Sequence, residues 1–427
     1  PIRSIPAKPV SVETDLVSAV LSTRGAVIRS VSLNNYLDSA GKPVKLIQPG
    51  EVARFPLYLD LGDATLNALV NESNYSVNVD SLALNADKPE GEVQFTLTMQ
   101  EGIRITKTLT FHNSRYGIDV AVMIEGLPAD LRLDSHRVFW GDHLSEEDIA
   151  HDKRISYDRI VTLVGQKREE LRPDKVASEE RYQERLRWTA LTTKYFLAAL
   201  IPRDPSASAV VRRTHNAKAE VGLEFSRTGG PTADAFILYV GPKETNALKP
   251  YNVSLERVVN FGWFNVVAVP LLKALLLFYS FTHNYAVAIV LLTVLVKVLF
   301  YPLTGKSFRS MRQMQDLQPK MKLIQERWKN DRQKMNEEML ALYREHKVNP
   351  LGGCLPIMLQ MPVFFALYKV LYDAIELRHA PGFLWIHDLS GRDIPLTILM
   401  GASMYFQQKL SPTVGDPRQA KMMLYLM

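Results

Sequence analysis

The sequence has almost no cysteine, since Cys354 is the one thiol among 427 residues. An intramolecular disulfide is therefore excluded, and because Cys354 lies within an apolar segment we interpret it as a small buried residue. Motifs of nucleotide and hydrolytic chemistry are also missing: there is no Gly-rich phosphate loop, no HExxH sequence and no serine elbow. These absences argue against an enzyme, and no cofactor is expected.

The densest polar cluster is a weak candidate for a metal site. It consists of Asp142, His143, Glu146, Glu147, Asp148 and His151. No tight His or Cys spacing fixes a tetrahedral set of ligands there. A solvated loop is therefore the favoured interpretation, and no metal is expected.

Long apolar runs are absent from the first 255 residues but frequent from Phe261 onward. A chain of 427 residues is long enough for two or three domains. Residues 1–245 contain short stretches of alternating apolar and polar residues between Gly, Asn and Asp turns, which predicts an antiparallel β-sandwich. We also expect a helix around residues 178–190. The stretches most typical of strands are 10–13, 26–33, 76–85, 93–98, 103–109, 117–124, 207–213 and 235–240.

The second half of the sequence has the pattern of a membrane protein. Residues 246–283 predict a linker and then an interfacial amphipathic helix, because their apolar run is short for a span and contains Pro270 and Lys273. Residues 284–427 predict a membrane core. We place its spans at 284–304, 350–377 and 394–410, with the start of a further span at 420–427. Because the chain starts at Pro1 and stops within an apolar run, we expect both ends to be trimmed.

The segment 305–349, between the first two predicted spans, is strongly basic. It holds eleven Lys and Arg against six Asp and Glu, which supplies most of the net charge of +6. Basic loops between spans stay in the cytoplasm, so residues 378–393 and the β-domain are expected on the outer side. A nucleic-acid surface would instead spread its basic residues over a folded face, so no nucleic-acid partner is expected.

Lys297 is the most unusual residue of the apolar half. It follows twelve uncharged residues, and Thr293 lies one helical turn before it on the same face. A cation in hydrocarbon costs roughly 2.5–3.5 kcal/mol, so a polar cavity is one interpretation. Snorkelling is the other, because Thr304 is about 10 Å away by helical rise and a lysine side chain reaches that far. The residues alone leave both interpretations open.

Apolar residues spaced by three or four predict a helical hairpin within 305–349. Pro319 is expected to kink or restart its first arm. The two apolar stripes either pack on each other or form a docking surface, because Met-rich faces adapt to varied apolar partners. The residues proposed for docking are Met311, Met314, Met321 and Trp328 on the first arm, and Met335 and Met339 on the second.

From residue 285 to its end the sequence resembles the YidC insertases, which are relatives of the Oxa and Albino proteins of organelles. The similar stretches follow in the same order and spacing as in that family. They are residues 296–304, 317–320, 347–356, 360–368, 384–389 and 411–413. The run Lys-Val-Asn-Pro-Leu-Gly-Gly-Cys-Leu-Pro at 347–356 is the most specific of them.

The resemblance implies a multidomain inner-membrane protein with a periplasmic all-β supersandwich, a polytopic α-helical membrane core and a cytoplasmic helical hairpin. It also implies a hydrophilic groove, open to the cytoplasm, with a cation at Lys297 and with Thr293 and Gln360 at lining positions. Many bacterial relatives have arginine at the position of Lys297, so the charge is kept here but the bidentate fork is not. The family core has five spanning helices, and this sequence reaches the start of the fourth.

The implied function is a membrane protein insertase and chaperone without enzymatic activity. The expected partners are nascent membrane proteins, the Sec translocon, the ribosome or the signal recognition particle, and the lipid bilayer. Two rivals remain: a transporter or channel with Lys297 as an anion site, and an envelope receptor whose β-domain binds sugar or peptide. The sequence lacks a second half similar to the first, which inverted-repeat transporters often show. Deletion of most of the β-domain separates an insertase, which should survive, from a receptor.

Overall fold

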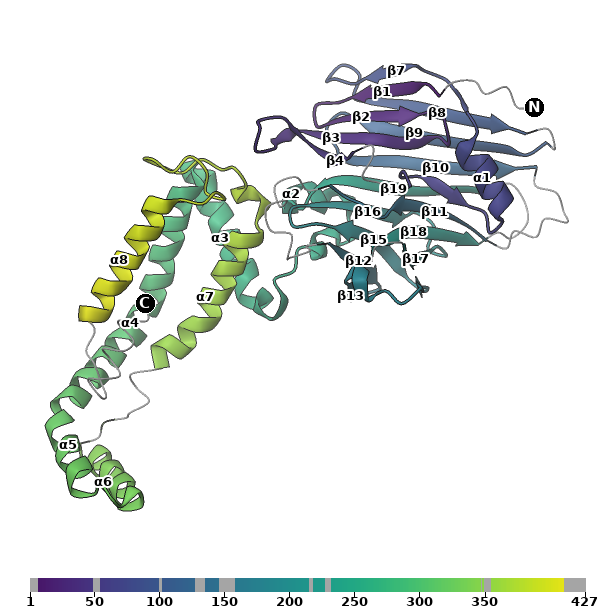
Figure 1. Ribbon diagram of the computed structural model, residues 1–427. Coiled ribbons are helices and arrows are strands. Elements are labelled where there is room, and N and C mark those ends of the chain that lie inside the picture. Colours follow the sequence, from purple (N-terminus) through teal and green to yellow (C-terminus); the bar gives the residue numbers. More distant parts are fainter. Residues whose placement is uncertain are drawn as a thin grey trace. The chain divides into compact units, whose positions relative to one another are not determined.

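The computed structural model of the chain (Figure 1) describes residues 7–48, 54–99, 102–126, 135–145, 158–214, 218–226, 232–346, 348 and 355–410. The chain divides into two compact units, Pro1–Val259 and Asn260–Met427. The first unit is almost entirely β-structure, and the second is helical.

The first unit is built from three sheets. Their strands are β1 (Pro9–Glu13), β2 (Val17–Ser22), β3 (Val27–Leu37), β4 (Pro43–Ile47), β5 (Tyr58–Asp60), β6 (Ser76–Val77), β7 (Ser81–Ala83), β8 (Glu90–Thr98), β9 (Arg104–His112), β10 (Gly117–Glu125), β11 (Ser135–Gly141), β12 (Arg159–Val164), β13 (Lys167–Leu171), β14 (Glu179–Tyr182), β15 (Leu186–Thr192), β16 (Phe196–Pro202), β17 (Ser208–Arg213), β18 (Ala219–Ser226) and β19 (Thr232–Pro242).

Nine strands form the largest sheet, in the order β13-β12-β15-β16-β19-β10-β9-β8-β6. The two five-stranded sheets have the orders β4-β3-β2-β1-β7 and β14-β17-β18-β11-β5. The nine-stranded sheet packs on the second of these through β15, β16, β17 and β18. Among the strands described, β1 and β7 pair in parallel and the other pairs are antiparallel. This layered architecture confirms the antiparallel β-sandwich that the sequence predicts.

Period-two alternation identifies the strands that have one buried face. In β9 every second residue from Ile105 to Phe111 is buried, as the pattern of residues 103–109 predicts. The stretches 10–13, 26–33, 93–98, 117–124, 207–213 and 235–240 likewise fall on β1, β3, β8, β10, β17 and β19. Residues 76–85 form two short strands, β6 and β7, rather than one.

The helix predicted around residues 178–190 is wrong, because these residues form β14 and β15. Glu179 pairs with one arginine of another strand and with one of its own strand, and not along a helix. Arg137 Nη1 on β11 lies 3.1 Å from the Glu179 carboxylate, and Arg181 Nε lies 3.0 Å from the same group. Such pairs stabilise a sheet surface. The many charged residues of this segment are therefore compatible with strands as well as with a helix.

Helix α1 (Ala64–Glu72) was not predicted from the sequence. Asp63 caps it, since its side chain accepts hydrogen bonds from the Thr65 and Leu66 amides at 2.9 Å each. Asn67 and Asn71 of α1 then accept hydrogen bonds from the amides of Leu61 and Leu59, at 2.6 and 2.9 Å. These side chains occupy the free edge of β5, which protects that edge from pairing with another chain.

The first unit extends beyond its last strand. After β19, helix α2 (Thr245–Leu248) and short turns pack against the sheet, and the fully buried Trp188 donates its indole N–H to the Val253 carbonyl at 3.2 Å. Arg257 bonds the side chain and the carbonyl of Gln166, at 2.9 Å in both cases. The compact unit therefore ends at Val259 rather than at residue 245.

One lysine is fully buried in the first unit. Lys107 on β9 has no exposed surface, and its Nζ donates to the carbonyl oxygens of Gly25 and Leu57 at 2.7 and 2.6 Å. The Ala26 carbonyl oxygen lies 3.4 Å away. All three residues that supply these acceptor carbonyls have positive φ angles. Burial lowers the pKa of Lys107 to about 7, because the charged form loses its hydration.

The helices of the second unit are α3 (Asn265–Thr282), α4 (Tyr285–Asp316), α5 (Gln318–Arg327), α6 (Arg332–Glu345), α7 (Leu355–Asp373) and α8 (Ile394–Leu410). Helix α3 packs against α4 and α7 (Figure 1). The buried residues of α3 are Ala268, Leu272 and Leu275, whose spacing of three or four places them on one face. Small and apolar residues on this face let the neighbouring helices approach.

Two helical segments in the described part of the chain are long and apolar enough to cross a membrane: Gly262–Thr282 and Tyr285–Asp316. The first contains α3, which was expected to lie in the interface, so by length it also qualifies as a span. The segments predicted as spans at 350–377 and 394–410 contain α7 and α8, and their role as spans stays a prediction. The span predicted to begin at 420–427 lies outside the described residues.

Helix α4 continues well past the predicted end of the first span at residue 304. Its 32 residues include Pro302 and reach Asp316, so one helix contains both the predicted span and the first part of the basic segment. Pro319 lies in the first turn of α5, where proline is tolerated, so a new helix begins at this proline. Asp331 begins the second arm, since its side chain accepts from the Lys334 amide of α6 at 3.1 Å.

Candidate functional site

Lys297 lies in the apolar part of α4 with an exposed side chain. It is the one charged residue between positions 285 and 305. In the described part of the chain it makes no ion pair, and Thr293, one turn away, is exposed and donates its hydroxyl to the Ile289 carbonyl at 2.8 Å. A solitary cation on this surface is available to an anionic partner.

Gln360 lies on α7, which contacts both α3 and α4. Its side chain is exposed, as are those of Lys297 and Thr293. The three predicted groove residues thus come from two helices that contact each other, and none of the three is covered by protein. Their convergence in one groove stays a prediction.

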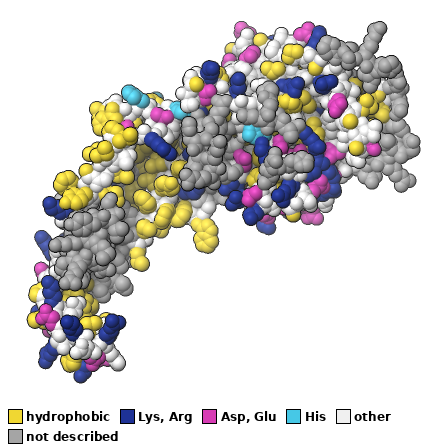
Figure 2. All heavy atoms as spheres, viewed as in Figure 1, with side chains coloured by type: hydrophobic (Ala, Val, Ile, Leu, Met, Phe, Trp, Pro, Cys, Tyr) yellow, Lys and Arg dark blue, Asp and Glu magenta, His cyan; other side chains and the backbone are white. Residues whose placement is uncertain are grey.

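The helices around these residues expose large apolar side chains, and Figure 2 shows hydrophobic side chains gathered over this unit. Val298 and Leu299, next to Lys297, are 65% and 72% exposed. A water-soluble surface does not tolerate a continuous apolar band of this kind. Further members are Val290 and Val294 on α4, Met358, Phe364 and Tyr368 on α7, and Ile394, Ile398, Leu399 and Phe406 on α8.

The basic hairpin has a small core of its own. Met314, Leu317 and Val348 are buried together, and Met321 and Tyr343 pack against them. Of the residues proposed for docking, Met314 is therefore used for packing, whereas Met311, Met321, Trp328, Met335 and Met339 are half-buried. The docking role of this set stays a prediction.

The most exposed apolar side chains of the basic segment are ones that the sequence interpretation did not select. Phe308, Leu323 and Leu340 are 53%, 66% and 52% exposed. Near the turn, the ammonium of Lys334 lies 4.6 Å from the centre of the Trp328 ring. Apolar groups beside cations on one surface suit a partner with mixed apolar and acidic character.

Of the six residues of the possible metal cluster, Asp142 and His143 lie within the described part of the chain. Asp142 accepts from the Thr214 hydroxyl at 3.2 Å, and His143 Nδ1 lies 3.3 Å from Lys218 Nζ. Glu146, Glu147, Asp148 and His151 lie outside the described residues. Within the ranges that the structure does describe, there is no group of three or more His, Cys, Asp or Glu positioned for a metal.

Replacement of Leu317 by alanine is expected to loosen the hairpin. Leu317 is 5% exposed and lies where α4 ends, so the change removes buried contacts at about 2 kcal/mol. Amide hydrogen exchange in α6 should become faster as a result. Leu323→Ala is the matched control, because Leu323 is 66% exposed and its loss should change the exchange little. Equal exchange in the two variants would contradict a shared core between the arms.

Two family models together match the chain from residue 9 to its end. Residues 9–274 match the YidC periplasmic domain, and residues 277–427 match the 60Kd inner membrane protein. The first match alone covers more than half of the chain. The chain belongs to the YidC family.

Curated YidC relatives match almost the whole chain. The membrane protein insertase YidC of Geotalea uraniireducens (strain Rf4) is 38% identical, over 99% of this chain and 81% of its own. Those of Geobacter metallireducens and Syntrophus aciditrophicus are 37% and 36% identical, each over 98% of this chain and over 79% and 78% of their own. These relatives are named for insertion into membranes and not for a chemical reaction.

Solved structures give a weaker likeness. A putative aldose 1-epimerase from Escherichia coli K12 matches 55% of this chain and 99% of its own, with a TM-score of 0.36 and 9% identity. A likeness at this level has no bearing on the function of a YidC chain.

The two YidC models meet inside α3, between residues 274 and 277. The first unit therefore corresponds to the periplasmic part of the family and α4 to its inner-membrane part. The sequence interpretation missed the buried Lys107. One signal was present, because Lys107 occupies an inward position in the alternation of residues 103–109.

Proposed function

We propose that this YidC-family chain is a membrane protein insertase and chaperone of the bacterial inner membrane. The names of its relatives support this, since the match covers nearly the whole chain. The structural observation that carries the proposal is the single exposed cation, Lys297, on an otherwise apolar stretch of α4. No nucleotide is required, because partitioning of about 20 apolar residues into a bilayer is favourable.

The proposed arrangement places the first unit in the periplasm as a β-supersandwich and the helical unit in the membrane as a multi-pass core. The exposed apolar side chains of α4, α7 and α8 support burial of these helices in lipid. The basic segment 305–349 lies in the cytoplasm by the rule for positive loops. Phe383 and Trp385, in the opposite loop, then lie near the outer interface, where aromatic residues are enriched.

The proposed mechanism uses a hydrophilic groove lined by Lys297, Thr293 and Gln360 and open to the cytoplasm. A nascent segment with a short acidic tail enters the groove, and its carboxylates are attracted to Lys297. Water in the groove shortens the path of low dielectric constant that the tail must cross. The apolar part of the nascent segment meanwhile moves into lipid along α4 and α7, whose exposed side chains are apolar.

The hairpin of α5 and α6 is proposed to receive the delivery machinery: the ribosome, the signal recognition particle or the Sec translocon. Its half-buried methionines and the exposed Phe308, Leu323 and Leu340 support a docking role. Flexible Met side chains and cations beside apolar groups let one surface accept several partners.

The proposal is tested by reconstituting the protein in liposomes with a single-span substrate that has an acidic tail. Protection of the substrate tail from added protease should require the protein, with empty liposomes as the control. If a folded, reconstituted protein gives no protection of a competent substrate, the insertase proposal fails and an anion transporter becomes the better interpretation. Chloride or phosphate uptake by the same liposomes measures that alternative directly.

A further inference from the structure

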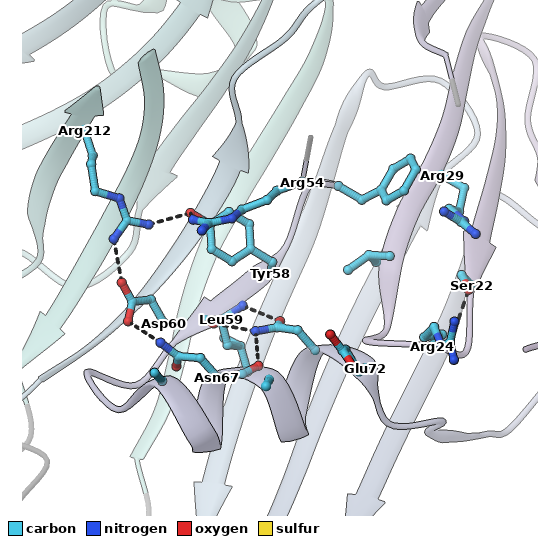
Figure 3. A pocket seen from close by; sticks show the side chains of 15 residues that line it. Ser22, Arg24, Arg29, Arg54, Tyr58, Leu59, Asp60, Asn67, Glu72 and Arg212 are labelled. Carbon is cyan, nitrogen blue, oxygen red and sulfur yellow. Dashed lines mark hydrogen bonds and ion pairs between the residues drawn. The ribbon is translucent and has the colours of Figure 1, made fainter. Parts of the chain in front are cut away.

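A pocket of about 570 Å³ lies in the first unit beside α1 (Figure 3). This volume is typical of sites for small molecules. Four arginines line it: Arg24 and Arg29 from the β2–β3 hairpin, Arg54 from the segment before β5, and Arg212 from β17. The acidic lining residues are Asp60 and Glu72, so the lining has more cations than anions.

Two of the arginines are already engaged by carboxylates. Arg212 lies 2.8 Å from Asp60 and 2.6 Å from Glu220, and its Nη2 also donates to the Tyr58 hydroxyl at 2.7 Å. Arg54 lies 3.7 Å from the same Glu220 carboxylate. This network neutralises one end of the pocket and leaves little capacity there for a further anion.

Arg24 and Arg29 are different, because neither guanidinium has a carboxylate partner among the described residues. Arg29 instead lies 4.3 Å from the centre of the Phe55 ring, an arrangement that leaves its N–H groups free to donate. Glu72 lines the same end of the pocket, but no ion pair joins it to either arginine in the described part of the chain. Two lining arginines thus have no carboxylate partner among the described residues.

The walls that hold these arginines are fixed by buried contacts. Lys107 joins the carbonyls of Gly25 and Leu57, which lie in the two segments that contribute Arg24 and Tyr58 to the lining. Gly25 also packs directly on α1, since a Cβ there would collide with the Asn71 carbonyl oxygen. A pocket whose walls are held in this way loses little conformational entropy when a ligand binds.

We propose that this pocket binds a phosphate group through Arg24 and Arg29. A carboxylate has two oxygens and satisfies one guanidinium fork, whereas a phosphate has enough oxygens to accept from two forks at once. The remaining volume, bordered by Val27 and Phe55, accommodates an organic substituent. The phosphate belongs to a soluble phosphate ester or to a phospholipid headgroup. This site is independent of the proposed insertase function.

Isothermal titration calorimetry of the detergent-solubilised protein tests the site with two probes. Glycerol 3-phosphate represents a soluble ester, and dihexanoyl phosphatidylglycerol below its micellar concentration represents a headgroup. Saturable binding of either probe supports the site, and the tighter probe identifies the source of the phosphate. The double variant Arg24→Gln, Arg29→Gln should bind at least tenfold more weakly. Its melting temperature should change little, because neither arginine forms an ion pair in the described structure and the contact of Arg29 with the Phe55 ring is a weak one.

The matched control is Arg104→Gln, because Arg104 is an exposed arginine of the same unit that does not line the pocket. Its affinity for both probes should equal that of the unmodified protein. Three results would overturn the proposal: no saturable binding of either probe, equal affinity in the double variant, or equally tight binding of glutarate. The last result would show that the forks do not distinguish phosphate from carboxylate.

Discussion

Lys297→Glu is expected to reduce insertion of a substrate with an acidic tail by at least tenfold. The change converts the attraction between residue 297 and a substrate carboxylate into a repulsion. Either interaction is worth roughly 1 kcal/mol at 4 Å in water and about 4 kcal/mol at an effective dielectric constant of 20. Because Lys297 is the one charge between positions 285 and 305, no neighbouring cation on this part of α4 compensates. Protease protection in liposomes measures the effect.

The specificity of this effect is tested by two comparisons. Lys306→Glu makes the same charge reversal on an exposed residue of the same helix, beyond the apolar stretch, and should leave insertion nearly unchanged. A substrate with a neutral tail should be affected much less than the acidic one by Lys297→Glu. Lys297→Arg keeps the charge and should retain activity. Normal insertion of the acidic substrate by Lys297→Glu would sink the electrostatic mechanism and leave Lys297 as a snorkelling residue.

Lys107→Met is expected to destabilise the first unit by about 2–4 kcal/mol at pH 9. Methionine fills most of the volume but donates no hydrogen bond, so the carbonyl oxygens of Gly25 and Leu57 lose their buried donor. Urea unfolding followed by tryptophan fluorescence measures the change, since Trp140 and Trp188 are fully buried in this unit. Lys88→Met, at an exposed lysine of the same unit, should cost little.

The same comparison has a defined pH dependence. The pKa of Lys107 is about 7 in the folded protein and rises to its ordinary value of 10.5 on unfolding. Between these values the unfolded chain binds more protons, so the stability of the unmodified protein increases as the pH rises from 7 towards 10. Lys107→Met has no titrating group at this position, so its stability does not gain from the rise in pH. The difference in unfolding free energy between the unmodified protein and the variant, its deficit, should therefore grow over the same range. A deficit that is equal at pH 7 and pH 9 would show that the carbonyl cage keeps Lys107 charged.

Strands with one buried face were predictable, and strands buried on both faces were not. In β9 the alternation of buried and half-buried residues matches the alternation of apolar and polar side chains. In β16 the six residues Phe196–Ile201 are all buried, because the central part of the nine-stranded sheet is covered on both sides. Their sequence therefore has no period of two, and length alone does not separate such a run from a short buried helix.

The residues of the candidate site were predictable to different degrees. Lys297 was found because a charge within an apolar run has few physical explanations. The pocket of arginines was not, since Arg24 and Arg29 belong to the β2–β3 hairpin of one five-stranded sheet and Arg212 lies on β17 of the other. No local pattern encodes how separate sheets pack. The hairpin was predicted from its apolar spacing, but the division of its methionines between core and surface depends on how the arms pack.

The uninterrupted course of α4 has a mechanical consequence. A helix of 32 residues is a stiff lever of about 48 Å, with Lys297 near its middle and the hairpin attached to its end at Asp316. Pro302 lies between them and removes the backbone hydrogen bond to the Val298 carbonyl, which makes this point the most compliant joint of the lever. A bend of about 10° at the joint moves the Asp316 end by roughly 4 Å. A load on the hairpin would therefore be taken up as bending at Pro302, and the turn that holds Lys297 would keep its place.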